Sequence, residues 1–155
     1  MNEIHSMIGD SFEGEDSDAN SKIRTVVPTR TFLEKLFLLA EEFQKDNPRS
    51  MRRSRYLYGL GKLMDTQYGR EALADRSLYD AIVEHRRTYY ALRYVNYDLH
   101  APATIDFMIP DRAMEAWRTD YAEMRRFFIY GQSLEFDALM ERINELQERV
   151  SEERP

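Results

Sequence analysis

Apolar residues recur at helical spacing through most of this chain, and this pattern restricts it to a mainly helical fold. The clearest segment runs from Thr31 to Phe43, where the apolar side chains form one arc on a wheel of about 100° per residue. The spacing Thr31-x-x-Glu34 predicts a capping box at the start of this helix. Lys35 lies at the edge of the arc, where a lysine either extends into water or points into a cleft.

Four further helices are predicted after this one. In chain order they begin at Pro48 or Ser50, at Leu78, at Pro110 and after Ser133. We expect residues 69–76 to form a connector and Ser77 to cap the third helix, which continues to about Tyr94. The last two helices are separated only by a short turn at Gly131. Helices joined in this way pack side by side, so we expect an antiparallel hairpin at the C-terminus.

The N-terminal segment is different in character. Residues 21–27 are rich in β-branched side chains and predict a strand, which pairs either with residues 4–8 or with a strand of a polypeptide not present here. The acidic loop between these segments contains Asp16-x-Asp18. We interpret this pair as solvated rather than metal-binding, because Ser21 stands where a calcium loop needs glycine.

Length and composition set the class of protein. At 155 residues the chain is expected to be one domain, with a lead-in over residues 1–30 and a helical part over residues 31–155. The fold class is therefore mainly α with a minor β element. Cysteine is absent, which excludes disulfides and thiolate sites. No apolar run approaches the roughly 20 residues that span a bilayer, and the N-terminus lacks the basic start of a signal peptide. We expect a cytoplasmic chain without a membrane partner.

The net charge of −6 conceals an uneven distribution. Residues 1–20 carry six acids and no lysine or arginine, whereas the segment 49–62 carries no acid. The basic residues of that segment are Arg49, Arg52, Arg53, Arg55 and Lys62. Helical spacing places Arg52, Arg55 and Lys62 on one face together with Gly59. Such a row of cations either faces solvent or binds phosphate, because guanidinium groups match phosphate oxygens.

A group of tyrosines lies near the end of the third predicted helix. Its members are Tyr89, Tyr90, Tyr94 and Tyr97, with Arg86, Arg87 and Arg93 beside them. Aromatic rings interleaved with arginine can stack nucleic-acid bases, but tyrosines at helical spacing also pack with a hydrated hydroxyl. His85 is interpreted as a hydrogen-bonded core or boundary residue.

Two stretches of the central segment resemble a known family. They are Pro28-Thr29-Arg30-Thr31-Phe32-Leu33-Glu34-Lys35-Leu36 and Arg52-x-x-Arg55-x-Leu57-Tyr58-x-Leu60. Both resemble the later motifs of the nucleotidyltransferase AbiEii/AbiGii toxins of bacterial abortive-infection, phage-defence and toxin–antitoxin systems. Asp120-Tyr121-x-x-Met124 and Tyr130-Gly131-x-Ser133 resemble the closing helices of its members. The resemblance covers nearly the whole chain but only the C-terminal half of such a protein.

The resemblance implies metal-dependent transfer of a nucleotide from an NTP, with tRNA ends as the known type of acceptor. Lys35 matches the catalytic lysine, which would contact the triphosphate, and Arg52 and Arg55 match the helix arginines. Lys62 extends this set as a further candidate for binding phosphate. The partners implied are NTP, Mg²⁺ and tRNA, an antitoxin, and an N-terminal nucleotidyltransferase half.

Several departures from the family pattern indicate an incomplete enzyme. The family shows histidine and aspartate where this chain has Tyr56 and Gly59, and no Gly-Gly/Ser turn followed by a strand with the Asp-x-Asp metal pair is present. We therefore expect a truncated or split member that is not catalytic alone and holds no metal itself. The alternative is a non-catalytic module that binds RNA or a protein partner through residues 49–62. In a third interpretation, apolar surface around Ile23, Val26 and the first helix is uncovered, and a homodimer buries it.

Overall fold

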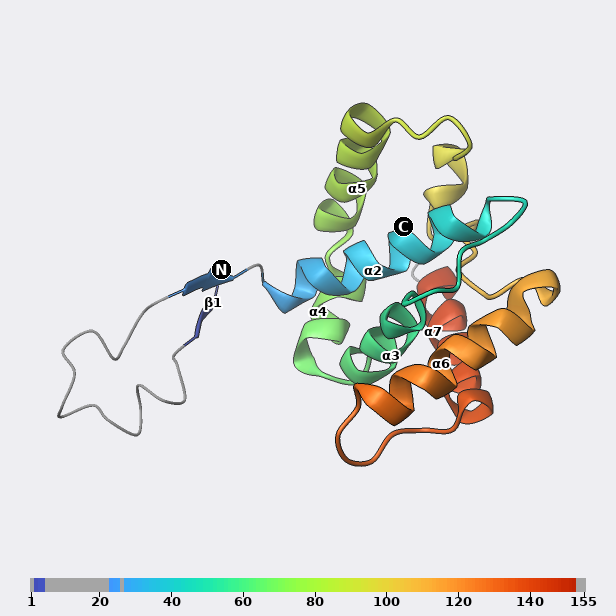
Figure 1. Cartoon of the computed structure of the whole chain (residues 1–155). Helices are drawn as coiled ribbons and strands as arrows, with labels where there is room; N and C mark the ends of the chain where they lie inside the picture. Colours follow the sequence, from blue (N-terminus) through green and yellow to red (C-terminus); the bar gives the residue numbers. More distant parts are fainter. Residues whose placement is uncertain (1, 5–22, 26, 153–155) are drawn as a thin grey trace, which may run out of the picture.

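The structure, a computed structural model, describes residues 2–4, 23–25 and 27–152 (Figure 1). Its α-helices are α2 (Pro28–Phe43), α3 (Ser54–Leu63), α4 (Gln67–Ala74), α5 (Arg76–His85), α6 (Met114–Phe127) and α7 (Phe136–Glu152). A π-helix, Arg86–Tyr90, continues α5, and short 3₁₀ turns lie at Tyr97–His100 and Asp111–Ala113. The predicted mainly helical fold is confirmed.

Two short strands precede the helices. β1 (Asn2–Ile4) and β2 (Ile23–Thr25) are antiparallel, with Asn2 opposite Thr25 and Ile4 opposite Ile23. Val27, the last residue of the expected strand, is not in a strand and directly precedes α2. The remaining residues of the two expected strands, and the Asp16-x-Asp18 pair, lie outside the described part of the chain. Pro28 then begins α2, a position that suits proline because the first turn of a helix leaves its N–H groups without helical partners.

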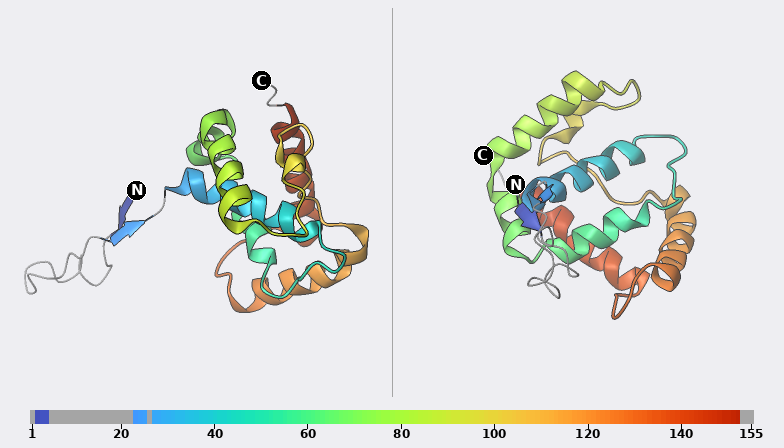
Figure 2. Two further views of the ribbon diagram at one scale, coloured as in Figure 1. Left: turned by 90° about the horizontal axis from the view of Figure 1, so that it is seen from above. Right: turned by 60° about the vertical axis from the view of Figure 1, so that its left-hand side comes forward.

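α2 lies at the centre of the molecule, with the other helices around it (Figures 1 and 2). The apolar arc predicted for this helix is buried: Phe32, Leu33, Leu36 and Phe37 are 0% exposed. The expectation of an uncovered apolar surface on the first helix is therefore wrong, because α3, α4 and α5 of the same chain cover it. The side chains of Ile23 and Val26 lie outside the described part.

The segment between α3 and α5 corrects two predictions. The expected connector over residues 69–76 is the helix α4, whose N-cap residue Thr66 accepts a hydrogen bond from the backbone N–H of Gly69. α5 begins earlier than predicted, because Asp75 rather than Ser77 caps it by accepting from Leu78 N–H at 2.9 Å. After α5 the chain widens into the π-helix.

The last two helices occur where they were predicted, but they do not form an antiparallel hairpin. α6 and α7 cross at a steep angle, and α3 packs against both (Figures 1 and 2). Gly61 lets α3 approach α7 closely, because a Cβ atom there would lie 2.7 Å from Leu139 Cδ1 of α7. The hairpin prediction was wrong because it assumed a short turn at Gly131, whereas residues 128–135 separate the two helices and a connection of this length does not hold them side by side.

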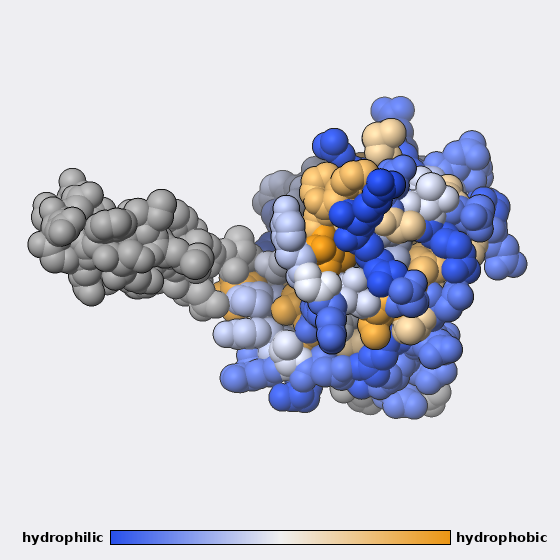
Figure 3. All heavy atoms as spheres, turned by 60° about the horizontal axis from the view of Figure 1, so that its bottom comes forward, coloured by the Kyte–Doolittle hydropathy of each residue, from blue (hydrophilic) through white to orange (hydrophobic). Residues whose placement is uncertain are grey.

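Hydrophobic surface gathers where α6 ends. Phe127 is 59% exposed, Phe128 68% and Leu134 47%, and all lie at the α6–α7 connection. Figure 3 turns the lower side of Figure 1, where this connection runs, towards the viewer, and shows hydrophobic residues grouped within a hydrophilic face. Within the described residues, no helix is long and apolar enough to cross a membrane.

Candidate functional site

The N-terminus of α3 is positioned by an acid from another helix. Asp120 of α6 accepts hydrogen bonds from the backbone N–H of Arg52 at 2.6 Å and of Ser54 at 3.0 Å, and from the Ser54 hydroxyl. These bonds satisfy N–H groups that a helix start leaves unpaired. Sequence reasoning noted Asp120 but assigned it no role, because capping by a residue 66 positions away has no local signal.

Arg52 does not lie on the face of α3 where helical spacing placed it. It precedes the helix in a turn and has a φ of 57°, a left-handed conformation that is uncommon for residues other than glycine. Its backbone is held by Asp120 while its side chain is exposed. The prediction of one face containing Arg52, Arg55 and Lys62 is therefore wrong for Arg52, because α3 begins two residues after it.

Three cations from α2 and α3 surround the ring of Tyr56. The charged groups lie 5.9 Å (Lys35), 5.8 Å (Arg53) and 5.1 Å (Arg55) from its centroid, within the range of cation–π attraction. Arg55 Nη2 also donates a hydrogen bond to the Tyr56 hydroxyl at 3.2 Å. We call Lys35, Arg53, Arg55 and Tyr56 the cation cluster. Lys35 and Arg55 were predicted as site residues; Arg53 and Tyr56 were not.

The cation cluster produces a positive field. Partial burial acts to raise the pKa of Tyr56, but the hydrogen bond from Arg55 and the three nearby positive charges outweigh it, so this pKa lies below its ordinary value. Among the residues that the structure describes, no carboxylate forms an ion pair with Lys35, Arg53 or Arg55. An anion that bound here would meet cations that no described acid neutralises.

Gly59 allows Lys35 to lie against α3. A Cβ atom at position 59 would be 2.7 Å from Lys35 Cε and 3.1 Å from its Cδ. Without a side chain at Gly59, the end of Lys35 reaches the cation cluster directly across the helix surface. Lys62 lies elsewhere on α3, with its ammonium group 5.6 Å from the ring centroid of Tyr58 rather than at Tyr56.

A groove of about 560 Å³ adjoins the cation cluster. It is lined by Glu34, Leu38, Glu41, Glu42, Lys45, Arg53, Arg86, Tyr89, Tyr90, Leu92 and Tyr94. Arg86 is only 2% exposed and donates two hydrogen bonds of 2.7 Å to the carboxylate of Glu41. Arg86 also contacts Glu34. Lys45 pairs with Glu42 at 2.7 Å, so the charges of the groove largely neutralise one another.

The histidines of the described part do not form a catalytic pair. His85 is half-buried and packs against Tyr89, with ring centroids 4.7 Å apart. His100 is fully buried between Phe37 and Tyr97, and neither ring nitrogen has a hydrogen-bond partner. Burial lowers the pKa of His100 below its ordinary value, although the nearby carboxylate of Glu41 acts in the opposite direction.

The described residues do not fit a bound Mg²⁺. No group of three histidines or carboxylates among them is arranged to hold a metal ion, and the carboxylates that line the adjoining groove are paired with Arg86 and Lys45. Asp16 and Asp18 lie outside the described part. What the site offers chemically is therefore a surface for anions rather than metal ligands.

Comparison with known families identifies the chain at the family level. The model of the family described as nucleotidyl transferase AbiEii toxin, type IV toxin–antitoxin system, matches residues 3–142. No curated protein and no solved structure matches the chain. The match includes every residue of the cation cluster and of the groove. The chain belongs to the AbiEii family of nucleotidyltransferase toxins.

Proposed function

We propose that this chain provides the triphosphate-binding part of a toxin-type nucleotidyltransferase. The observation that carries the proposal is the convergence of Lys35, Arg53 and Arg55 on Tyr56 without a carboxylate partner among the described residues. Most other arginines of the described part pair with an acid or a backbone carbonyl, as Arg86 and Arg142 do. Cations left free in one place suit a polyanionic ligand.

Each cation suits a different part of that task. Lys35 places a compact charge beside Gly59, where a triphosphate oxygen can approach it. Arg55 and Arg53 present planar guanidinium groups, which can donate two hydrogen bonds to one phosphate. Transfer of a nucleotide develops negative charge on the leaving pyrophosphate, and these cations would stabilise it. Mg²⁺ would supply further stabilisation when bound in such an enzyme, but the described residues offer it no group of three histidine or carboxylate ligands.

The acceptor and partners follow from the family. We propose the end of a tRNA as acceptor, an NTP as donor, and an antitoxin as the regulating partner, in the cytoplasm where NTPs and tRNA occur. Metal-binding carboxylates would come from another nucleotidyltransferase segment, so that Lys35, Arg53 and Arg55 complete a site built from two parts.

Binding of tripolyphosphate tests the proposal. The purified chain is titrated with tripolyphosphate alone, and Lys35→Ala and Arg55→Ala should each weaken binding by roughly tenfold or more, since one charge-assisted hydrogen bond contributes about 1.5–3 kcal/mol. Arg126→Ala serves as the matched control, because this exposed arginine lies on α6 and packs on Phe127. The proposal would be contradicted if the Lys35 and Arg55 variants bound tripolyphosphate as tightly as the wild type. It would also be contradicted if the control variant lost as much affinity as they do.

A second candidate function is RNA binding without catalysis. It is favoured by the exposed residues Arg49, Arg52 and Arg55, whose guanidinium groups form no ion pair with an acid among the described residues. Incubation with labelled NTP, Mg²⁺ and total tRNA separates the two functions. Label in the tRNA supports transfer by this chain itself. If the tRNA is not labelled but still binds the chain, and if its affinity falls at higher salt and after Arg52→Ala, the result supports a binding module.

A further inference from the structure

We propose that the groove beside the cation cluster binds unpaired bases of a single-stranded RNA end, stacked on Tyr89, Tyr90 and Tyr94. This inference rests on the proposed function, because it uses the cation cluster as the site for the phosphates. It adds a base-binding site made of residues from the π-helix and the loop after it, none of which the sequence motifs include.

The groove and the cation cluster share a residue. Arg53 lines the groove and also lies 5.8 Å from the ring of Tyr56, where Lys35 and Arg55 meet. A ligand with phosphates at the cation cluster therefore continues past Arg53 into the groove. Nucleic-acid chains have this form, since each phosphate is followed by a base within a few bonds.

Tyrosine rings lie at the groove with much of their surface free. Tyr89 is 74% exposed, Tyr90 50% and Tyr94 45%. Each ring nevertheless has a neighbour that holds it. His85 lies 4.7 Å from Tyr89, the guanidinium of Arg86 lies 4.8 Å from Tyr90, and the ammonium of Lys45 lies 5.0 Å from Tyr94, each measured to the ring centroid. Exposed aromatic rings held in place are suited to stacking bases.

The backbone carrying these rings has an unusual conformation. The π-helix Arg86–Tyr90 ends at Ala91, whose φ of 44° and ψ of 45° place it in the left-handed region. This conformation is unfavourable for a residue with a Cβ atom, and π-helical turns occur often at functional sites. The loop that follows is tied to α2, because Asn96 N–H donates to Gln44 Oε1 at 2.7 Å.

The charges of the groove favour bases over phosphates. Its carboxylates, Glu34, Glu41 and Glu42, are paired with Arg86 and Lys45, which leaves no free cation among these five residues. A phosphate would meet carboxylate oxygens there, whereas the exocyclic amino groups of bases can donate to them. Glu34 is the most accessible of the three, with a side chain 22% exposed. Phosphates are thus expected at the cation cluster and bases in the groove.

The test compares two ligands that differ only in their bases. One is a short single-stranded oligoribonucleotide, and the other is an abasic chain with the same number of phosphates. Tyr89→Ala and Tyr94→Ala should each weaken binding of the oligoribonucleotide by about tenfold, since stacking on one ring contributes that order of affinity. Binding of the abasic chain and of tripolyphosphate should stay as in the wild type. Tyr94→Phe is the matched control and should retain affinity, because it keeps the ring.

The outcomes separate the groove from the proposed function. Tyrosine variants that bind the oligoribonucleotide like the wild type overturn the groove proposal, and so does an equal loss for the abasic chain or a failure of Tyr94→Phe to retain affinity. A groove used only by a peptide of a protein partner would give the first of these results. In another outcome, Lys35→Ala leaves the affinity for tripolyphosphate unchanged, but the tyrosine substitutions weaken binding of the oligoribonucleotide. That result supports the groove proposal and contradicts the proposed function.

Discussion

At the scale of single residues, His100 makes folding depend on pH. Its ring is buried without a partner for either nitrogen, and burial lowers its pKa below the ordinary value of 6.5. A base whose pKa is lower in the folded state binds more protons when unfolded. The neutral form therefore stabilises the fold fully above about pH 6.5, and this contribution is lost as the pH falls towards the folded pKa. The charged groups that face the ring are Glu41, Arg86 and Arg87.

His100→Phe should remove this dependence. Phenylalanine keeps the contacts with Phe37 and Tyr97 and has no nitrogen to protonate. Between pH 6.5 and pH 5 the free energy of unfolding should fall in the wild type, by at most about 1.4 kcal/mol per pH unit for one proton, and should change less in the variant. The free energy of unfolding is measured by urea denaturation, followed by circular dichroism, at several pH values. If the free energy of unfolding changes equally with pH in the wild type and the variant, His100 is not the group that causes the pH dependence.

Gly59 is the second residue at which a substitution has an expected effect, in this case on the binding of tripolyphosphate. Gly59→Asp places a carboxylate against Lys35 and four residues after Arg55, where it pairs with both cations. We expect the variant to lose most of its tripolyphosphate affinity while α3 gains stability. Gly59→Ala is the control: it removes the cost of about 1 kcal/mol for glycine in a helix, but it adds no charge and only displaces the end of Lys35. Similar tripolyphosphate binding by the two variants would contradict the expected neutralisation.

At the scale of elements, the junction of α3 and α4 depends on Gly69. A Cβ atom there would lie 2.3 Å from the Leu63 carbonyl oxygen and 2.8 Å from Met64 Cα, and backbone atoms cannot move aside as a side chain does. Gly69→Ala should therefore destabilise the protein by about 1–3 kcal/mol, the usual cost of overpacking. Gly61→Ala is the comparison, since its Cβ meets only the side chain of Leu139. If the urea midpoint falls equally in Gly69→Ala and Gly61→Ala, the clash with backbone atoms is not the cause of the destabilisation.

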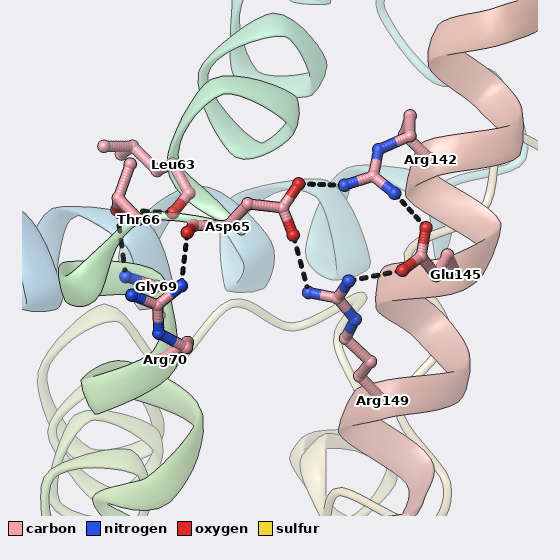
Figure 4. A network of polar contacts seen from close by, with 8 residues as sticks. All are labelled: Leu63, Asp65, Thr66, Gly69, Arg70, Arg142, Glu145 and Arg149. Atoms are coloured by element: carbon pink, nitrogen blue, oxygen red, sulfur yellow. Dashed lines mark hydrogen bonds and ion pairs between the residues drawn. The ribbon is translucent and has the colours of Figure 1, made fainter.

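α7 is joined to the α3–α4 junction by an ion-pair network. Asp65 accepts from Arg149 Nη1 at 3.0 Å and pairs with Arg142, and both arginines also pair with Glu145 (Figure 4). The side chain of Asp65 is 57% exposed, so solvent screens these pairs. Asp65→Asn should lower the free energy of unfolding by less than about 1 kcal/mol, and by less still in 1 M salt. A larger loss that salt does not reduce would indicate a buried role.

At the scale of the whole molecule, one core joins all the α-helices. Trp117 of α6, the single tryptophan of the chain, is 0% exposed and packs edge-on against Phe43 of α2 at 4.9 Å. The helices should therefore unfold together. Tryptophan fluorescence and far-ultraviolet circular dichroism should give the same urea midpoint. Two separated midpoints would mean that the predicted single domain consists of two units.

Much of the helical structure could be predicted because it depends on local patterns. The apolar arc of residues 32–43 is sufficient to predict α2 and its buried face, and the same reasoning located α6 and α7. Predictions that needed a partner were less successful. α4 was missed because Gly69 is typical of a connector when the sequence is considered alone, and only its close packing on Leu63 and Met64 explains a glycine inside this helix. The hairpin failed because residues 128–135 separate α6 from α7 and α3 packs against both helices.

The candidate site shows the same division. Lys35 and Arg55 are recognisable in the sequence because they stand in motifs, and the prediction that they bind triphosphate remains to be tested. Arg53 was named only as one basic residue of segment 49–62, and Tyr56 only as a departure from the family pattern, because their shared place in the cation cluster comes from the packing of α2 on α3. The homodimer also stays a prediction, although the apolar arc of α2 is buried, whereas hydrophobic residues at the end of α6 are exposed.

By itself the sequence determined a mainly helical chain and its family, and it supplied candidate residues for binding phosphate, because helical period and motif depend only on neighbours along the chain. Tertiary structure alone decided that Asp120 caps α3, that Gly59 makes room for Lys35, and that the charges of Glu41 and Arg86 cancel beside the groove. The physical reason is distance: charges and caps act over a few ångströms, and folding brings together groups that are tens of residues apart.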